Sequence, residues 1–357
     1  MADASPTLAE KIGQMVLVGF RGLAVGETDP VVQDLRQRHL GAVVLFDQDV
    51  GDPSLPWRNV QSPEQVRALV ATLRAAAREP LLVAIDQEGG RVSRLKATYG
   101  FSDTLSHEEV GRRNDPTFTF THADLIARTL AGLGINLNLA PVVDLDANPA
   151  NPIIKGKQRC FGADPEVVAA HALAFARAHR QRGVLTCPKH FPGHGSAGGD
   201  THLGLVDVTR TWSERELIPY QRLLEAGQLD MLMTAHVFNA RLDTEHPATL
   251  SCRVLQDLLR DRLGYQGLIL SDDMEMKAIT SRYGLEQAVE LGVQAGLDIL
   301  CFGNNLVHDP QIGERVTGLL LRLVERGRIS EARIDESFQR IQRLKRRLQA
   351  TDGLAAS

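Results

Sequence analysis

The stretch LLVAID (residues 81–86) combines the two features that decide the fold, a short continuous apolar run and a carboxylate at its end. Such a run lacks polar alternation, which is typical of a parallel strand that is covered on both faces. Seven further apolar runs, most of them also continuous, are spread along the 357 residues. They cover residues 15–20, 41–46, 135–143, 184–191, 231–237, 267–273 and 297–303.

Helical patterns separate these runs, at residues 63–78, 165–182, 213–226, 253–263 and 285–295. Local signals support them: Ser62 stands before Pro63 as a candidate N-cap, and Ser213 precedes an acidic first turn. Eight strands that alternate with helices predict an α/β fold, a single (β/α)8 TIM-type barrel over residues 1–357. The last helix is expected at about residues 330–349. A doubly wound open sheet is the alternative arrangement.

Three segments are too long to be simple connections, namely residues 47–61, 144–162 and 193–210. They lie after predicted strands, and the long loops of a barrel are where function is usually found. We therefore expect extended loops around an active site.

The composition is that of an ordinary globular protein, and nothing in the sequence requires a macromolecular partner. The net charge of -4 and the pI near 6.3 give no sign of nucleic acid or an anionic membrane as a partner. No stretch approaches the roughly 20 apolar residues that span a bilayer, and residues 1–10 do not form a secretory signal.

The basic cluster at residues 340–347 is expected to be a solvated helix face. Four separated cysteines are expected to be buried free thiols, so the default compartment is the cytoplasm. A monomer is expected.

Polar residues stand at the ends of five predicted strands: Asp86, Asp144, Lys189 with His190, His236, and Asp272 with Asp273. The carboxyl ends of barrel strands meet at one mouth, so these side chains are expected to face a single cavity. Burying ionisable groups at the ends of strands carries a desolvation penalty, unless the groups bind a ligand or pair with one another. This convergence predicts an active site.

The glycine-rich segment KHFPGHGSAGGDTH (residues 189–202) carries the most chemistry. Asp200 and His202 are two residues apart, close enough for the carboxylate to fix the tautomer of the imidazole and stabilise its protonated form. The alternative is a polar loop with ordinary histidines. A metal site is a further alternative, with ligands drawn from His190, His194, His202, His236, Asp86 and Asp272. Against it, proline and glycines make a helical His190–His194 pair improbable, and no HExxH motif occurs.

Two other motifs bring carboxylates to the predicted mouth. GLILSDDM (residues 267–274) is a strand that ends in two aspartates, which should point to different places because side chains alternate. Either one suits attack on an anomeric carbon, or they form a cap and a salt bridge. DQEGGRV (residues 86–92) lacks the pattern of a phosphate loop; Asp86 could bind vicinal sugar hydroxyls. Arg159, in the loop after the fourth strand, is either a ligand donor or a surface residue.

Taken together, the motifs resemble the family 3 glycoside hydrolases, in particular the single-domain bacterial β-N-acetylglucosaminidases. The resemblance covers about residues 8–348 and rests on an ordered set rather than on one element. The set is IGQM (12–15), DQEGGRV (86–92), NLAPVVD (138–144), RCFG (159–162), KHFPGHG (189–195), DTH (200–202), AH (235–236), PATLS (247–251) and SDDM (271–274).

This resemblance implies roles for individual residues. Asp272, directly after Ser271, matches the family's nucleophile, and His202 matches its acid/base, oriented by Asp200. The residues that would hold the sugar hydroxyls are Asp86, Arg159, Lys189 and His190. The implied reaction passes through a covalent glycosyl intermediate and needs no metal or organic cofactor.

The resemblance also implies a substrate. Larger family members that cleave glucosides or xylosides carry a second domain and a glutamate acid/base, whereas the Asp-x-His pattern marks the hexosaminidase branch. The implied substrate is N-acetylglucosamine linked to 1,6-anhydro-N-acetylmuramic acid, with or without its peptide, in cytoplasmic cell-wall recycling. Other hypotheses are a different sugar preference, a phosphorylase-like variant that uses phosphate in place of water, a metal-dependent hydrolase and a noncatalytic sugar-binding barrel.

Three departures from the family pattern concern loops. Residues 47–60 form a longer connection than usual, rich in proline and glycine, which could change the pocket rim or a contact surface. Residues 196–199 (SAGG) would let the catalytic loop rest in an open position. Residues 203–206 (LGLV) lack the proline often found after the histidine, so the exit of that loop is open to question.

Overall fold

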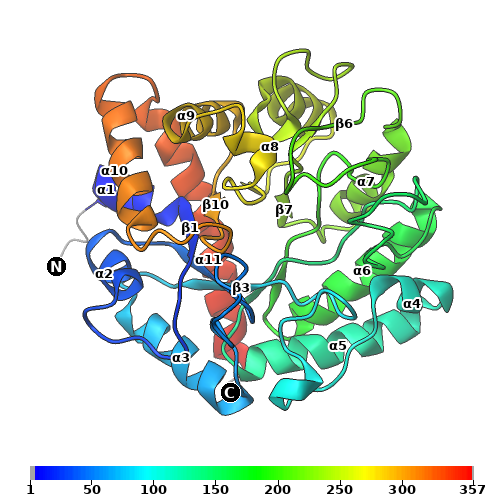
Figure 1. The fold of residues 1–357 in the computed structure, drawn as a ribbon, viewed down its shortest axis with the longest axis horizontal. Helices are drawn as coiled ribbons and strands as arrows, with labels where there is room; N and C mark the ends of the chain where they lie inside the picture. The colour runs from blue at the N-terminus through cyan, green and yellow to red at the C-terminus, as the bar shows by residue number, and fades with distance from the viewer. Residues whose placement is uncertain (1–4, 356–357) are drawn as a thin grey trace.

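The structure is a computed structural model that describes residues 5–355, with side chains as far as residue 348. Within these residues, eight short parallel strands form a closed ring, which confirms the predicted barrel (Figure 1). They are β1 Val16–Gly19, β2 Ala42–Leu45, β3 Leu82–Ile85, β4 Leu137–Asn138, β5 Leu185–Thr186, β7 Met231–Met233, β9 Leu268–Leu270 and β10 Leu300–Phe302. The pairing order is β10-β1-β2-β3-β4-β5, and β7 pairs with β9. Single parallel bridges, Phe191 to Thr234 and Leu270 to Ile299, close the ring.

Helices cover the outside of the ring and follow one another around it in chain order (Figure 1). They are α2 Pro30–Gln37, α3 Pro63–Ala76, α4 His107–Arg112, α5 Pro116–Gly132, α6 Pro165–Gln181, α7 Ile218–Glu225, α8 Lys277–Thr280, α9 Leu285–Ala295 and α10 Ile312–Glu325. The predicted helix at residues 253–263 is a π-helix, Arg253–Arg262. A small pair, β6 Val206–Asp207 with β8 Val237–Phe238, lies outside the ring.

Local signals start several of these helices. The Ser62 hydroxyl accepts the N–H of Gln65 at 3.2 Å at the start of α3, with Pro63 as the first helical residue, as predicted. Ser213 makes no such capping bond, and a 3₁₀ turn at Glu214–Leu217 leads into α7 instead. At the start of α1, Leu8–Gln14, Thr7 and Glu10 form a reciprocal capping box.

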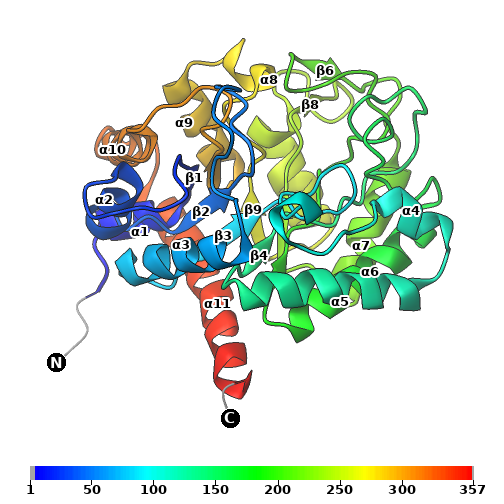
Figure 2. The same cartoon turned by 60° about the horizontal axis from the view of Figure 1, so that its bottom comes forward.

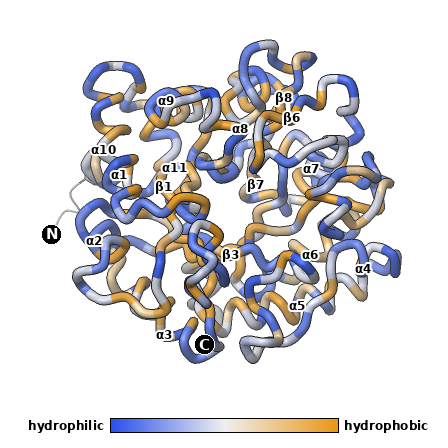
Figure 3. The backbone as a smooth tube through the Cα atoms, viewed as in Figure 1, coloured by the Kyte–Doolittle hydropathy of each residue, from blue (hydrophilic) through white to orange (hydrophobic). Residues whose placement is uncertain are grey.

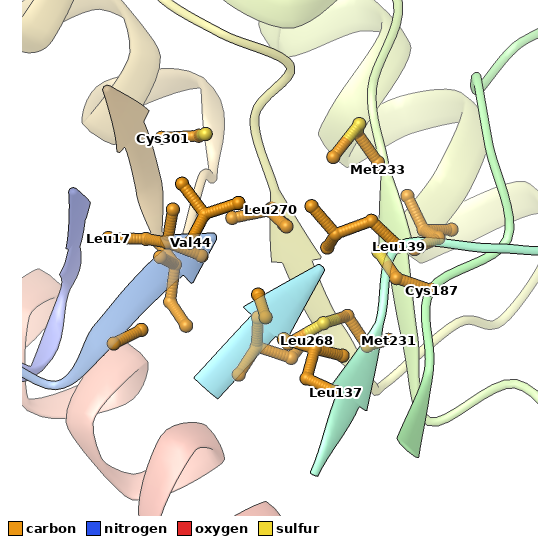
Figure 4. Close-up of a cluster of buried hydrophobic side chains, with 14 of the residues drawn as sticks. Leu17, Val44, Leu137, Leu139, Cys187, Met231, Met233, Leu268, Leu270 and Cys301 are labelled. Atoms are coloured by element: carbon orange, nitrogen blue, oxygen red, sulfur yellow. The ribbon is translucent and has the colours of Figure 1, made fainter. Parts of the chain in front are cut away.

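Apolar side chains from different strands fill the inside of the ring, so the barrel is a packed core below its mouth (Figure 4). The labelled side chains include Leu17, Val44, Leu137, Leu139, Met231, Met233, Leu268 and Leu270. Around the ring, the helices alternate between hydrophobic and hydrophilic colours (Figure 3), as expected where one helical face packs on the strands.

The C-terminal helix α11, Glu331–Ala355, lies behind the strands in Figure 1 and projects below the barrel in Figure 2. Its basic cluster was expected to face solvent, and this is wrong for Lys345. That side chain is 1% exposed and donates hydrogen bonds to Gln14 Oε1 at 2.6 Å and to the Gly41 carbonyl at 2.9 Å. Arg340 pairs with buried Asp298 at 3.1 Å. The cluster therefore docks the helix on the floor of the barrel.

Two further expectations concern the cysteines and membranes. All four cysteines are free thiols, but Cys252 is exposed, so the prediction that all are buried is wrong for that residue. Among the helices that the structure describes, none has the length and apolar content needed to cross a membrane.

Candidate active site

A cavity of about 440 Å³ opens at the carboxyl ends of the strands. It brings together six of the seven residues that the sequence proposed for the site: Asp86, Arg159, Lys189, His190, His202 and Asp272. The seventh, Asp200, stands behind His202 and contacts it directly. Asp86 follows β3, Lys189 and His190 follow β5, and Asp272 follows β9. The predicted convergence of strand ends is therefore confirmed for these four residues.

A network of ion pairs forms one wall of the cavity. Lys189 Nζ lies 2.7 Å from Asp86 Oδ1 and 2.9 Å from Glu88 Oε1. Arg159 binds Glu88 with two parallel hydrogen bonds of 2.8 Å each. Burial would raise the pKa of Glu88, but Arg159 and Lys189 hold it well below its usual value. Arg159 is thus a buried member of the site and not a surface residue.

His190 is held from behind by Asp144. Its Nδ1 donates to Asp144 Oδ2 at 2.7 Å, and the N–H of His194 donates to Asp144 Oδ1, also at 2.7 Å. Because a carboxylate only accepts, the proton of neutral His190 sits on Nδ1, and Nε2 faces Arg159 Nη2 at 3.4 Å. Asp144 itself does not line the cavity. Asp144 lies in the loop after β4, where its carboxylate orients His190 and does not face the cavity.

The two aspartates after β9 have different environments. Burial opposes the ionisation of Asp272, but His236, His190 and His202 and the N–H of Asp273 bring its pKa down to about 2. Asp273 Oδ1 accepts the N–H groups of Glu275 and Gly303, and burial raises its pKa to about 6. Asp272 therefore stays ionised to a lower pH than Asp273 does.

Both aspartates line the cavity, but their carboxylates have different neighbours, since Asp273 Oδ1 binds the Glu275 and Gly303 N–H groups and Asp272 is close to the histidines. Strand β9 ends at Leu270, so the alternation of side chains stops before Asp272 is reached. His236, three residues after the end of β7, is fully buried beside them and does not line the cavity. Its Nε2 donates to the Asp273 carbonyl at 2.9 Å, and its Nδ1 lies 2.8 Å from Thr249 Oγ1.

The glycine-rich loop brings His202 to the cavity. Asp200 Oδ1 accepts both the backbone N–H of His202 at 2.8 Å and its Nδ1–H at 2.7 Å. The Thr201 carbonyl accepts the N–H of Ala278 at 3.1 Å, which ties the loop to α8. The side chain of His202 is 45% exposed, so it lies at the rim of the cavity and not at its bottom. The loop is thus seen in a position where acid/base and nucleophile candidates share one cavity.

Several functional residues were missed from the sequence. Glu88, the hub of the ion pairs, was present in the DQEGGRV motif without a role, and Asp144 was noted only as a strand end. The remaining polar cavity residues are Arg91, Arg94, Lys157, His194, Thr201 and Asp273. Within residues 5–355, no group of three or more His, Cys, Asp or Glu side chains is arranged to hold a metal ion.

The chain is similar to known proteins along most of its length. The Glycosyl hydrolase family 3 N terminal domain matches residues 7–344. A β-hexosaminidase from Stenotrophomonas maltophilia is 36% identical, over 88% of this chain and 92% of the relative. β-Hexosaminidase A from Pseudoalteromonas piscicida is 32% identical over 97% of this chain. A solved family 3 β-N-acetylglucosaminidase from Paenibacillus sp. str. FPU-7 superposes with a TM-score of 0.88 and 36% identity, over 98% of this chain.

These relatives differ in length. The chain spans 62% of the Pseudoalteromonas protein and 64% of the Paenibacillus structure, which is less than two thirds of either.

Proposed function

Because the chain belongs to glycosyl hydrolase family 3, we propose that it is a retaining β-N-acetylglucosaminidase that removes N-acetylglucosamine from the nonreducing end of its substrate. The observation that carries this proposal is the pairing of two groups in one cavity. Asp272 is ionised, with a pKa of about 2, and His202 has its Nδ1 committed to Asp200. These are the groups that the two steps of a retaining mechanism require.

In the first step, an Asp272 carboxylate oxygen attacks the anomeric carbon. The bond between that carbon and the glycosidic oxygen breaks, and the departing oxygen takes a proton from His202 Nε2. The products are a glycosyl ester on Asp272 and the free aglycone. Asp200 supports this step because its negative charge stabilises the protonated imidazole.

In the second step, the neutral His202 takes a proton from a water molecule. The water oxygen bonds to the anomeric carbon, and the bond from that carbon to Asp272 breaks. Two displacements at the same carbon retain the anomeric configuration. Every atom and proton is supplied by Asp272, His202, water and the sugar, so we propose that neither a metal ion nor an organic cofactor takes part.

The sugar pocket is assigned to Asp86, Arg159, Lys189 and His190. The ion pairs among Asp86, Lys189, Glu88 and Arg159 fix these side chains before substrate arrives. Such preorganisation lowers the conformational cost of binding a hydroxyl-rich ring. The β-hexosaminidase names of the relatives support N-acetylglucosamine as the sugar.

The finer parts of the proposal come from the family resemblance. We propose that the aglycone is 1,6-anhydro-N-acetylmuramic acid, with or without its peptide, and that the enzyme acts as a monomer in cytoplasmic cell-wall recycling.

The test is hydrolysis of 4-nitrophenyl N-acetyl-β-glucosaminide beside the β-glucoside and the β-xyloside, each with and without EDTA. We expect release from the N-acetyl substrate alone, at a rate that EDTA does not change. If the N-acetyl substrate is not hydrolysed, the proposed activity is overturned. Loss of the rate with EDTA overturns the metal-free mechanism and favours a metal-dependent hydrolase.

A further inference from the structure

Thr201 stands between Asp200 and His202 in the chain, and it is buried where they are not. It is 2% exposed, whereas His202 is exposed and Asp200 is half-buried. Of residues 198–205, all of which the structure describes, Thr201 alone is buried. This part of the glycine-rich loop therefore enters the protein interior at Thr201.

Two contacts hold Thr201 in place. Its carbonyl accepts the N–H of Ala278 at 3.1 Å, in the short helix α8 that follows Asp272 along the chain. Its hydroxyl oxygen, Oγ1, lies 3.3 Å from His194 Nε2 in a buried hydrogen bond. The carbonyl contact is available to any residue type at this position. The hydroxyl contact is therefore what threonine itself contributes.

His194 connects this hydroxyl to the sugar pocket. It is buried and lines the cavity, and its backbone N–H donates to Asp144 Oδ1 at 2.7 Å. The other oxygen of the same carboxylate accepts Nδ1–H of His190, also at 2.7 Å. The second ring nitrogen of His194, Nδ1, is buried and has no hydrogen-bond partner in the described part of the chain. The hydrogen bond to Thr201 is thus the contact that its ring makes.

The loop itself does little to fix the acid/base pair. Glycines at positions 198, 199 and 204 flank the pair and leave the backbone many conformations. The hydrogen bonds from His202 to Asp200 set the geometry within the pair, but not its place relative to the cavity. A buried hydrogen bond from the residue between them restricts that place. Such restriction matters, because a displacement of about 1 Å can cost a catalytic group about 10²-fold in rate.

We propose that Thr201 is a positioning residue, whose hydroxyl holds the Asp200–His202 pair at the cavity through its contact with His194. The inference rests on the proposed glycosidase activity, in which His202 protonates the departing oxygen. Thr201 also lines the cavity, so a direct contact with the sugar is the competing explanation. The two explanations differ in one respect: a sugar contact acts on every substrate, whereas a misplaced His202 matters only where the leaving group needs a proton.

The experiment compares two leaving groups. Thr201→Val keeps the branched shape of the side chain and removes the hydroxyl. On N-acetylglucosamine linked to 1,6-anhydro-N-acetylmuramic acid, we expect kcat/KM to fall by about tenfold to a hundredfold. On a dinitrophenyl N-acetylglucosaminide, whose leaving group departs without a proton, the fall should be less than about twofold. Thr201→Ser keeps the hydroxyl and should recover most of the loss.

Two further variants separate positioning from a general effect of mutation. Thr211→Val is the matched control, because Thr211 is exposed and its hydroxyl bonds locally to the Val208 carbonyl at 3.4 Å. Both rates should stay as in the wild type. In a His202→Ala background, Thr201→Val should add little further loss, since the group that it positions is already absent. Urea unfolding checks that Thr201→Val is folded, and Thr201→Ala replaces it if it is not.

Four outcomes overturn the inference. These are equal losses on the two substrates, an unchanged rate on the sugar aglycone, no recovery with Thr201→Ser, and a full further loss in the His202→Ala background. The wild-type enzyme separates these failures from failure of the proposed activity. If it cleaves the dinitrophenyl N-acetylglucosaminide, only the role of Thr201 is refuted; if it cleaves neither substrate, the proposed activity is overturned and this inference with it.

Discussion

Asp200 Oδ1 accepts two hydrogen bonds from His202, one from the backbone N–H at 2.8 Å and one from Nδ1–H at 2.7 Å. A single oxygen thus fixes both the position of the residue and the tautomer of its ring. Nε2 is left as the nitrogen that gains and loses a proton. The two residues stand on a glycine-rich loop whose backbone is tied to α8, so the pair is presented as a unit.

Replacing His202 should show a dependence on the leaving group. His202→Ala is expected to slow the hydrolysis of sugar aglycones by about 10²–10⁴-fold, the usual contribution of general acid catalysis. A dinitrophenyl glycoside should lose much less, because its leaving group departs without a proton. Measured kcat/KM values for the two substrate types decide the point. Equal losses on both would contradict the acid role.

Replacing Asp200 should act only through His202. Asp200→Ala is expected to lower the rate on sugar aglycones by less than His202→Ala does. Combining the two substitutions should add little to His202→Ala alone, because the carboxylate has no other function in the reaction. A double-mutant cycle on kcat/KM measures this coupling. Additive losses would mean that Asp200 contacts substrate independently.

The pH dependence of the nucleophile follows from its environment. The pKa of Asp272, at about 2, lies below its ordinary value, so the carboxylate stays ionised as pH falls and becomes protonated only near that value. A dinitrophenyl N-acetylglucosaminide needs no acid, so its kcat/KM reports the nucleophile. We expect this rate to stay level from pH 7 to pH 4, with circular dichroism as the check on folding. A decline centred above pH 4 while the protein stays folded would contradict the assignment.

Asp272→Ala should abolish turnover and leave the fold intact.

The position of the site could be predicted from the sequence, but most of the contacts between its side chains could not. Asp86, Lys189 and His190 could be placed because the ends of parallel strands meet at one mouth whatever the loops do. Asp144 ends the predicted strand at residues 135–143, but β4 ends at Asn138. Asp144 therefore stands in the loop, where it lies behind His190 because the direction of a side chain after a strand depends on the path of the loop. Glu88 lies three residues beyond the end of β3, where strand periodicity no longer applies. Its role emerges only when Arg159 and Lys189 are brought to it from distant segments.

The burial of Lys345 could be predicted only in part from the sequence. Counting basic residues predicted a solvated face, but Lys345 follows Ile341 by four positions and lies next to Leu344 on the helix, so it falls beside the buried stripe. Helical periodicity could have identified it as half-buried. The acceptors that make full burial tolerable, Gln14 and the Gly41 carbonyl, come from the other end of the chain. No local pattern reveals them.

Burial of Lys345 predicts a specific dependence of stability on pH. Burial lowers its pKa from 10.5 to about 7 in the folded protein. Between these values the unfolded chain binds more protons, so this residue makes the free energy of unfolding rise as pH increases from 7 to 10.5. Urea unfolding at pH 7, 8 and 9 should show a smaller rise for Lys345→Met than for the wild type. Arg346→Gln, on the exposed face of the same helix, should retain the wild-type rise; the same rise in Lys345→Met would refute the prediction.

Glu88 should be needed for both stability and sugar binding. Glu88→Gln keeps the shape of the side chain but leaves buried Arg159 without its anion and Lys189 with Asp86 alone. Removal of one partner from a buried ion pair typically costs about 3–5 kcal/mol, which urea unfolding can measure. Glu214→Gln is the control, since Glu214 pairs with Arg262 on the surface and its loss should change the unfolding midpoint little. The variant enzyme should also show a higher KM for N-acetylglucosaminides, because Arg159 and Lys189 are no longer held toward the sugar. An unchanged KM together with wild-type stability would mean that the ion-pair network does not organise the pocket.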